Sequence, residues 1–339
     1  MRLLDHVAQS RTRLRLLAHD REPMEVTSAA DFAGEVARCP IRYVLADDLT
    51  RACAELAFAD GDRLAGCIDL IRIPAPALWV EWSDEVHQRV IYECGSTQQF
   101  DTNSRGRRVG TLLQGSPDGR IGYARTFWRD GPADGAHEVA VSPLELHLDL
   151  RGAAAIARPG KDVFDGGFLS LSDTGDDGVN ALLECLRLRF DPRWARYYRS
   201  VATTEEARTE VVRGSLATVA RDIPLMLALF LLMSAHAATR PVRIARAAVN
   251  RKRVRLGESP LLDHVEVHSA IQPADDEDQP AHAADGERRP PRLHHVRGHL
   301  VRRGLRVFWR TSHLRVRSTY GVVRSRTVCL SFERTAHAG

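Results

Sequence analysis

The sequence predicts an α+β fold in which N-terminal helices and a mixed or antiparallel sheet, with a long Leu-rich helix, precede a small basic antiparallel β module. Three observations predict it: helical spacing in the first ~60 residues, short alternating runs after them, and a change of charge near residue 240. The chain has 339 residues, more than the roughly 250–300 at which a single core stops growing. Hydrophobic residues make up 44% and charged residues 27%, which excludes wholesale disorder.

The first elements follow from the spacing of apolar residues. Residues 3–20, 29–39 and 47–61 have helical spacing, and the last of these segments ends at Gly61. From residue 64 onward, Gly, Pro, Asp and Ser break the chain into short apolar or alternating runs, which indicates a strand meander. The runs are 64–83, 87–96, 108–116, 120–131 and 139–150.

Helical spacing returns at residues 178–200, where Pro192 interrupts the pattern. Thr203-x-x-Glu206 has the form of a capping box, which predicts a long helix through the Leu-rich run to about Thr239. Pro224 is expected to kink or split this helix. Its longest apolar run, 223–235, is shorter than the ~20 residues that cross a bilayer, so we expect a buried helix and no membrane partner.

The charge is polarised along the chain. Residues 1–239 hold 28 basic and 34 acidic side chains, whereas residues 240–339 hold 20 basic and 10 acidic ones. The sequence therefore divides into four parts: an α+β domain (1–239), a basic helix and strand (240–271), a flexible loop rich in acids and proline (272–291), and a basic β module (292–332).

The basic β module is the most one-sided part of the chain. Residues 288–326 contain 12 arginines and no acid, with Phe308, Trp309 and Tyr320 among them. Arginines attract phosphates, and aromatic rings can stack on bases, so we expect single-stranded RNA or mRNA as the partner. The predicted nucleic-acid-binding residues are Arg251, Lys252, Arg253, Arg297, His299, Arg302, Arg303, Trp309, Arg310, Arg324 and Arg326.

Two alternatives explain the same arginines without RNA. The basic strands could pair with the acids at 275–278 or with the acidic N-terminal part, or they could bind an acidic surface of another protein. A protein-interaction module without catalysis is therefore an alternative to an RNA-binding protein.

Histidines in the basic module raise the question of catalysis. His295, His299 and His313 are weak candidates for a metal-independent ribonuclease, in which a base and an acid act beside cations that bind the phosphate. Their spacing matches no zinc motif, and the glycine-rich stretch 165–178 lacks the Gly-Lys-Ser/Thr of a phosphate loop. The sequence therefore predicts no metal and no cofactor.

The segments NRKRVRLGESPLLDHVEV, PRLHHVRGHLVR and GVVRSRTVCL, with RIPAPALWVEW and VSPLELHLDL upstream, resemble a family carried by phages, plasmids and other mobile elements. The family includes a type V-A anti-CRISPR protein. The resemblance spans roughly residues 64–332, and Arg297, Gly298 and His299 form its most recognisable motif, to which no catalytic role is attached.

The resemblance implies an accessory protein that lowers the level of a target mRNA while the message is translated. It also implies a nascent peptide or a ribosome-associated partner. The six cysteines form no C-x-x-C pair and the N-terminus is unlike a signal peptide, so we expect a reduced, cytoplasmic protein.

Overall fold

A computed structural model was used to describe the chain. The residues that the structure describes are 2–9, 15–16, 29–58, 61–94, 106–129, 139–151, 164, 167–170, 186–219, 221–235, 238–270, 293–296, 299–304, 306–310, 313–315 and 322–323.

The fold is α+β, as predicted. Its helices in chain order are α1 (Leu3–Gln9), α2 (Ala29–Arg38), α3 (Asp47–Phe58), α4 (Gly61–Ala65), the short 3-10 helix η1 (Ile68–Leu70), α5 (Asp84–Glu93), α7 (Pro192–Val201), α8 (Glu205–Val219), α9 (Asp222–Ser234) and α10 (Ala247–Arg255).

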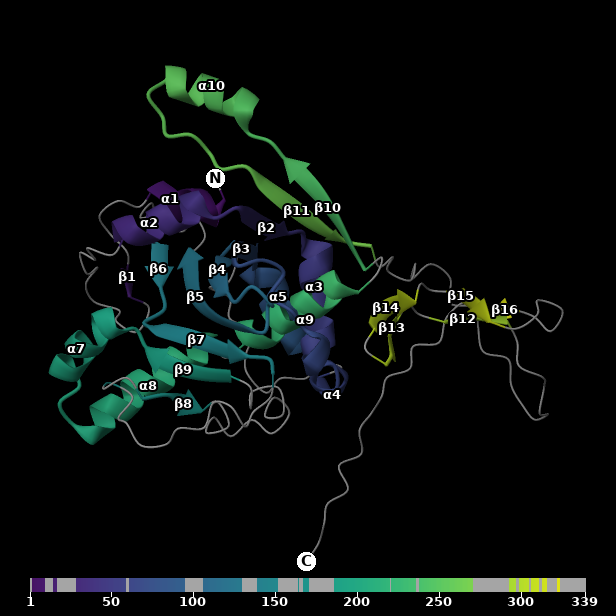
Figure 1. The fold of residues 1–339 in the computed structure, drawn as a ribbon, viewed down its shortest axis with the longest axis horizontal. Coiled ribbons are helices and arrows are strands. Elements are labelled where there is room, and N and C mark those ends of the chain that lie inside the picture. The colour runs from purple at the N-terminus through teal and green to yellow at the C-terminus, as the bar shows by residue number, and fades with distance from the viewer. Residues whose placement is uncertain are drawn as a thin grey trace, which may run out of the picture.

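One large mixed sheet forms the centre of the molecule (Figure 1). Its strands are β1 (Arg15–Leu16), β2 (Ile41–Leu45), β3 (Ala77–Ser83), β4 (Arg108–Gly115), β5 (Ile121–Arg129), β6 (Val139–Val141), β7 (Leu144–Asp149), β8 (Leu169–Ser170), β9 (Leu186–Phe190), β10 (Thr239–Ile244) and β11 (His264–Ser269). The order across the sheet is β10-β11-β2-β3-β4-β5-β7-β9-β8, and β6 pairs with β5 and β1. β11, β2 and β3 are parallel neighbours, while β3, β4, β5, β7 and β9 pair antiparallel in succession.

The core lies around β3 and α9. Trp79 and Trp82 project to opposite faces of β3 and are both fully buried, so this strand is packed on both sides. Gly110 on β4 lets the backbone approach Trp79 closely, because an added Cβ would lie 2.2 Å from Cζ2 of that ring. Every residue of α9 from Asp222 to Leu232 is buried, as expected for a helix that is apolar on all sides.

The predicted strands at 108–116, 120–131 and 139–150 are confirmed, but the run at 87–96 is a helix. α5 begins after Ser83, whose hydroxyl oxygen accepts a hydrogen bond from the Val86 amide at 3.4 Å. Asp84 and Glu85 then place negative charge in the first turn, where it stabilises a helix.

The segment 178–200 is also different from the prediction. Its described part is the strand β9 followed by the helix α7, and Pro192 is the first residue of α7. Proline is favoured at the first position of a helix because its missing N–H would have no intrahelical partner there. Leu188 and Phe190 are buried at a spacing of two residues, as in a strand with one face on the core.

The predicted long helix is split into α8 and α9. Pro224 does not cause the break, because it lies in the first turn of α9. The N-cap of α8 is Thr204, whose hydroxyl accepts from the Ala207 amide at 3.2 Å, so the predicted capping box is displaced by one residue. Within the described residues, no helix is long and apolar enough to cross a membrane.

The C-terminal part contains β12 (Leu293–Val296), β13 (His299–Arg303), β14 (Arg306–Arg310), β15 (His313–Arg315) and β16 (Val322–Val323). β13 pairs antiparallel with β14, and β12 pairs antiparallel with β15 and parallel with β16. The described strands of the predicted basic β module therefore belong to two separate sheets. The segment that the sequence sets apart at 240–271 supplies β10 and β11 of the main sheet.

Candidate nucleic-acid interface

The basic helix α10 lies at the tip of an arm formed by β10, α10 and β11 (Figure 1). β11 joins the arm to the sheet by pairing with β2, and the loop before β11 is held by a hydrogen bond of 2.8 Å from the Leu262 amide to Asp5 Oδ1. The α10 helix has no buried residue. Packing against a hydrophobic core therefore does not explain which residues α10 contains.

One side of α10 faces its own return loop. Asn250 Nδ2 donates to the Leu261 carbonyl, and Asn250 Oδ1 accepts from the Leu261 amide, each at 2.8 Å. Arg253 Nε donates to the Ser259 carbonyl at 2.9 Å, and its guanidinium lies 2.8 Å from Glu258. Arg253, which the sequence assigns to nucleic-acid binding, thus stabilises the arm itself.

The opposite side of α10 carries three cations. At ~100° per residue, Arg251, Lys252 and Arg255 lie together, turned away from Asn250 and Arg253. All three are exposed, and within the described part of the chain no hydrogen bond or ion pair engages their side chains. Like charges three and four residues apart repel, so this surface is stabilised when an anion binds to it. We call these three residues the cationic face.

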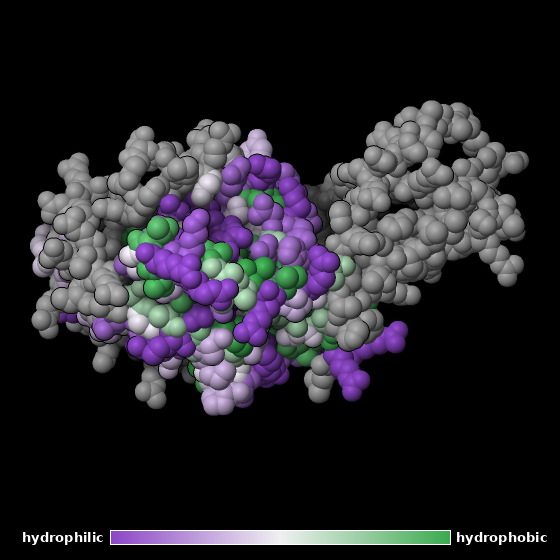
Figure 2. Space-filling model, turned by 90° about the horizontal axis from the view of Figure 1, so that it is seen from above, coloured by the Kyte–Doolittle hydropathy of each residue, from purple (hydrophilic) through white to green (hydrophobic). Residues whose placement is uncertain are grey.

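Apolar side chains flank the cationic face. Val249 is 45% exposed, Val254 is 61% exposed and Leu256, just after the helix, is 64% exposed. Figure 2 views the molecule from the side of α10 and shows hydrophilic and hydrophobic residues next to one another on that side of the molecule. A ligand with both phosphates and apolar surface matches this combination.

The β13–β14 hairpin is held against the body of the protein. Arg302 donates to both carboxylate oxygens of Asp69, at 3.0 and 2.9 Å, and also to the Gly66 carbonyl. Val307 packs against the main core. Arg302 therefore makes an intramolecular pair with the N-terminal part, which is the alternative that the sequence left open for these arginines.

Near its turn the same hairpin exposes two more arginines. Arg303 and Arg306 stand opposite each other in the ladder, and both are exposed. Figure 1 shows this hairpin well away from α10, so the structure separates the predicted binding residues into two surfaces. The cationic face and the hairpin do not form one continuous strip.

The remaining predicted residues are placed only by their backbone or not at all. His299 pairs with Arg310 and Leu300 pairs with Trp309 in the β13–β14 ladder. In the β12–β15 ladder Val296, three residues before His299, pairs with His313, three residues after Arg310, so the two ladders have the same register. His295 pairs with Leu314. Arg297, Gly298, Arg324 and Arg326 lie outside the described residues.

The sequence prediction overlooked a polar face on β4, β5, β7 and β9. Glu145 accepts hydrogen bonds from Arg125 at 3.0 Å and Arg189 at 2.7 Å, and its Oε1 lies 2.7 Å from His147 Nε2. Burial alone would raise the pKa of Glu145. The hydrogen bonds from His147 and Arg189 and the charges of Arg189 and Arg125 outweigh that effect and lower the pKa to about 2. The available signal was the alternation of polar and apolar residues in LELHLD and LRLRF.

Across the described ranges, no three His, Cys, Asp or Glu side chains are grouped so that they could hold a metal ion. Comparisons with family models, curated proteins and solved structures found no match. The proposal of a binding surface below therefore depends on the geometry of the chain.

Proposed function

We propose that the protein binds single-stranded RNA through the cationic face of α10. The observation that carries the proposal is that Arg251, Lys252 and Arg255 share one exposed side of a helix that contains no acid. The exposed Val249 and Val254 beside them supply apolar contact for sugars and bases. A single strand presents both kinds of surface, because its bases are not enclosed in a duplex.

The setting of α10 favours a single strand over duplex DNA. Strands β10 and β11 flank α10 in the chain, so it is not the second helix of a helix-turn-helix motif.

Binding of a single-stranded RNA oligonucleotide is expected to weaken as salt rises, and replacing all three residues of the cationic face by glutamine should reduce that dependence. Each phosphate contact contributes about 0.7 to the slope of log affinity against log salt for a single strand. The triple variant should therefore lose about 2 from the slope. Fluorescence anisotropy across a salt series measures it.

Arg89→Gln is the control, since it removes an exposed cation on α5 that is already paired with Glu85. Its slope should equal that of the unchanged protein. An equal loss in both variants would show that net charge, and not the cationic face, governs binding. No RNA binding at low salt would overturn the proposal and favour a protein-interaction module.

We further propose that the chain is an accessory protein of a mobile element that acts on a target mRNA during translation. The resemblance of residues 64–332 to the anti-CRISPR-containing family supports this proposal. In this interpretation the N-terminal body would contact a nascent peptide or a ribosome-associated partner, and the cationic face would hold the message.

Expression beside a reporter library of candidate transcripts tests this second proposal. The level of a target mRNA should fall with the unchanged protein and not with the glutamine triple variant. A fall that persists when the start codon of the target is removed would contradict action during translation. RNA fragments generated by the purified protein alone, and lost in His299→Ala, would instead support the ribonuclease alternative.

A further inference from the structure

Two rows of side chains cross the main sheet on the face opposite Leu113 and Ala124. The strand registers align Gln114, Tyr123, His147 and Arg187 in the first row. In the second row, Leu112 is aligned with Arg125 and Glu145 with Arg189. Most of these residues are polar, although the sheet lies at the centre of the fold. Gln114 and Tyr123 are exposed, so this part of the face is open to solvent and does not belong to the core.

The charges of the second row are satisfied within the protein. Arg125 donates to Glu145 and to Asp191, and its guanidinium lies over the rings of Phe32 and Trp194, at 4.8 and 5.5 Å from their centroids. Arg125, Arg189, Glu145 and Asp191 therefore form a neutral, well-fixed group. This group is rigid, and because its charges balance it does not favour a charged ligand.

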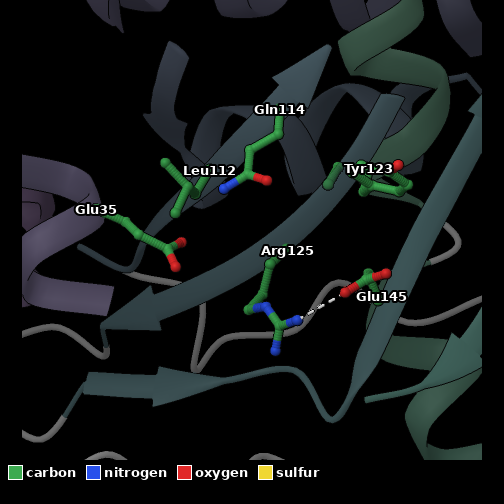
Figure 3. A pocket seen from close by; sticks show the side chains of 7 residues that line it. Glu35, Leu112, Gln114, Tyr123, Arg125 and Glu145 are labelled. Atoms are coloured by element: carbon green, nitrogen blue, oxygen red, sulfur yellow. Dashed lines mark hydrogen bonds and ion pairs between the residues drawn. The ribbon is translucent and has the colours of Figure 1, made fainter. Parts of the chain in front are cut away.

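An open hollow of about 110 Å³ lies over this group. Glu35 from α2 and Gln114 from β4 line it together with Tyr123, Arg125 and Glu145 (Figure 3). Among the residues that the structure describes, neither Glu35 nor Gln114 makes a side-chain hydrogen bond or ion pair. The hollow thus offers a carboxylate and an amide for a ligand to bind.

Aromatic rings form one side of the hollow and continue beyond it. Tyr123 is 45% exposed and meets the edge of His147 at a centroid distance of 4.9 Å. His147 in turn meets Phe168, which is 42% exposed, at 5.0 Å. Exposed rings fixed edge to face on a sheet are suited to stacking against planar ligands.

We propose that this hollow binds a guanine base of the single-stranded RNA, an inference that rests on the proposed function. The Glu35 carboxylate accepts hydrogen bonds from guanine N1–H and N2–H, and the Gln114 amide donates to O6. Tyr123 stacks on the base. Each polar group at the opening thereby gains a partner of the matching kind.

The residues around the hollow argue against other guests. Adenine presents its N1 acceptor where guanine presents a donor, so it would place a lone pair against the Glu35 carboxylate. Guanine is the base whose edge offers two adjacent donors to a carboxylate.

Titration of the full chain with guanosine, inosine and adenosine monophosphates, followed by calorimetry, tests the assignment. Inosine lacks the 2-amino group, so it should bind about tenfold more weakly than guanosine, and adenosine more weakly still. Equal affinity for the three nucleotides would overturn the assignment. So would the absence of guanosine monophosphate binding at millimolar concentration.

Two variants locate the site. Glu35→Gln should remove the preference for guanosine over inosine, and Tyr123→Leu should weaken binding of both by about tenfold. Glu55→Gln is the control, because it neutralises an exposed glutamate on α3 beside Arg51. A preference that survives Glu35→Gln would place the nucleotide elsewhere.

The proposal of a guanine site and the proposal of RNA binding can fail independently of each other. The cationic-face triple variant leaves the hollow intact, so it should bind guanosine monophosphate as the unchanged protein does. RNA binding without a guanine preference would remove only the hollow from the interface. Guanosine binding by a protein that does not bind RNA would reject the proposed function and with it the RNA as the source of the base.

Discussion

Replacement of Glu81 by alanine is expected to lower the free energy of unfolding by about 3–5 kcal/mol, the usual effect of removing one partner from a buried ion pair. Glu81 on β3 is fully buried and accepts from Arg108 Nε at 3.0 Å. It also accepts from the amides of Leu3 and Leu4 at 3.1 and 3.0 Å. The alanine variant leaves a buried guanidinium and two helix amides without their acceptor.

The Glu81 carboxylate fixes the start of α1 on the sheet, so the loss should be greatest at the N-terminus. Denaturant unfolding measures the total effect, and hydrogen exchange at Leu3 and Leu4 measures the local one. Glu93→Ala is the control, because Glu93 forms an exposed pair with Arg51 at 2.9 Å. Such surface pairs contribute about 0.2–1 kcal/mol. Similar losses in the two variants would show that Glu81 does not anchor α1.

Replacement of Asp222 by asparagine is expected to make the protein more stable at neutral pH and newly sensitive to acid. Asp222 begins α9, and its Oδ1 lies 3.8 Å from Nδ1 of the fully buried His87. Asp84 Oδ1 lies 3.9 Å from the same nitrogen. These distances are too long for hydrogen bonds, so burial dominates the titration of both groups.

Burial lowers the pKa of His87 to about 3, with a further lowering by the Arg221 charge. Burial raises the pKa of Asp222 well above its ordinary value, with a further rise from Asp84. The folded state therefore favours a proton on Asp222 and a neutral His87, whereas the unfolded chain between pH 3.8 and 6.5 favours an ionised aspartate and a protonated histidine, so the two pH dependences oppose each other. Stability that depends on the pair should be nearly independent of pH in that window.

The variants separate the two contributions. A depressed histidine pKa gives stability that is present above pH 6.5 and lost as pH falls toward 3. In Asp222→Asn only this contribution remains, so the free energy of unfolding should fall by about 1.4 kcal/mol for each pH unit below 6.5. In His87→Phe only the raised carboxyl remains, so stability should increase on acidification.

Thermal and denaturant unfolding from pH 7 to pH 4 measure these slopes, with Glu55→Gln as the exposed control. Slopes of the same sign in Asp222→Asn and His87→Phe would contradict the assignment. At pH 7 the asparagine variant should exceed the unchanged protein in stability, since it no longer requires a carboxyl to be protonated in the core.

Much of the fold could be predicted because the informative patterns are local. The short, mostly buried runs of β4 and β5, the alternation of β7 and the apolar run of α9 each lie within one short segment. The error at α5 arose because HQRVIYE has apolar residues that suit a strand or a helix. The decisive signals were Ser83 and the acids that follow it, which stand before the run.

The sites were less predictable, because they depend on pairs that are distant in the chain. The cationic face follows from composition and helix spacing, since all its members lie between residues 251 and 255. The pairing of Arg302 with Asp69 joins residues 233 positions apart, and no local pattern indicates it. The hollow requires the strand order β4-β5-β7-β9 before Glu35 and Gln114 can be recognised as neighbours.

The parallel pairing of β2 with β11 determines when the chain can complete its fold. Val267 and Leu45 are partners in that ladder, and the Ala46 amide donates to the Val267 carbonyl at 3.0 Å. β2 therefore lacks one neighbour until more than 220 further residues have been synthesised. Contacts of such high sequence separation slow folding. On the ribosome, α10 emerges before β11 closes the sheet, so the cationic face is outside the exit tunnel while the body of the protein is still incomplete.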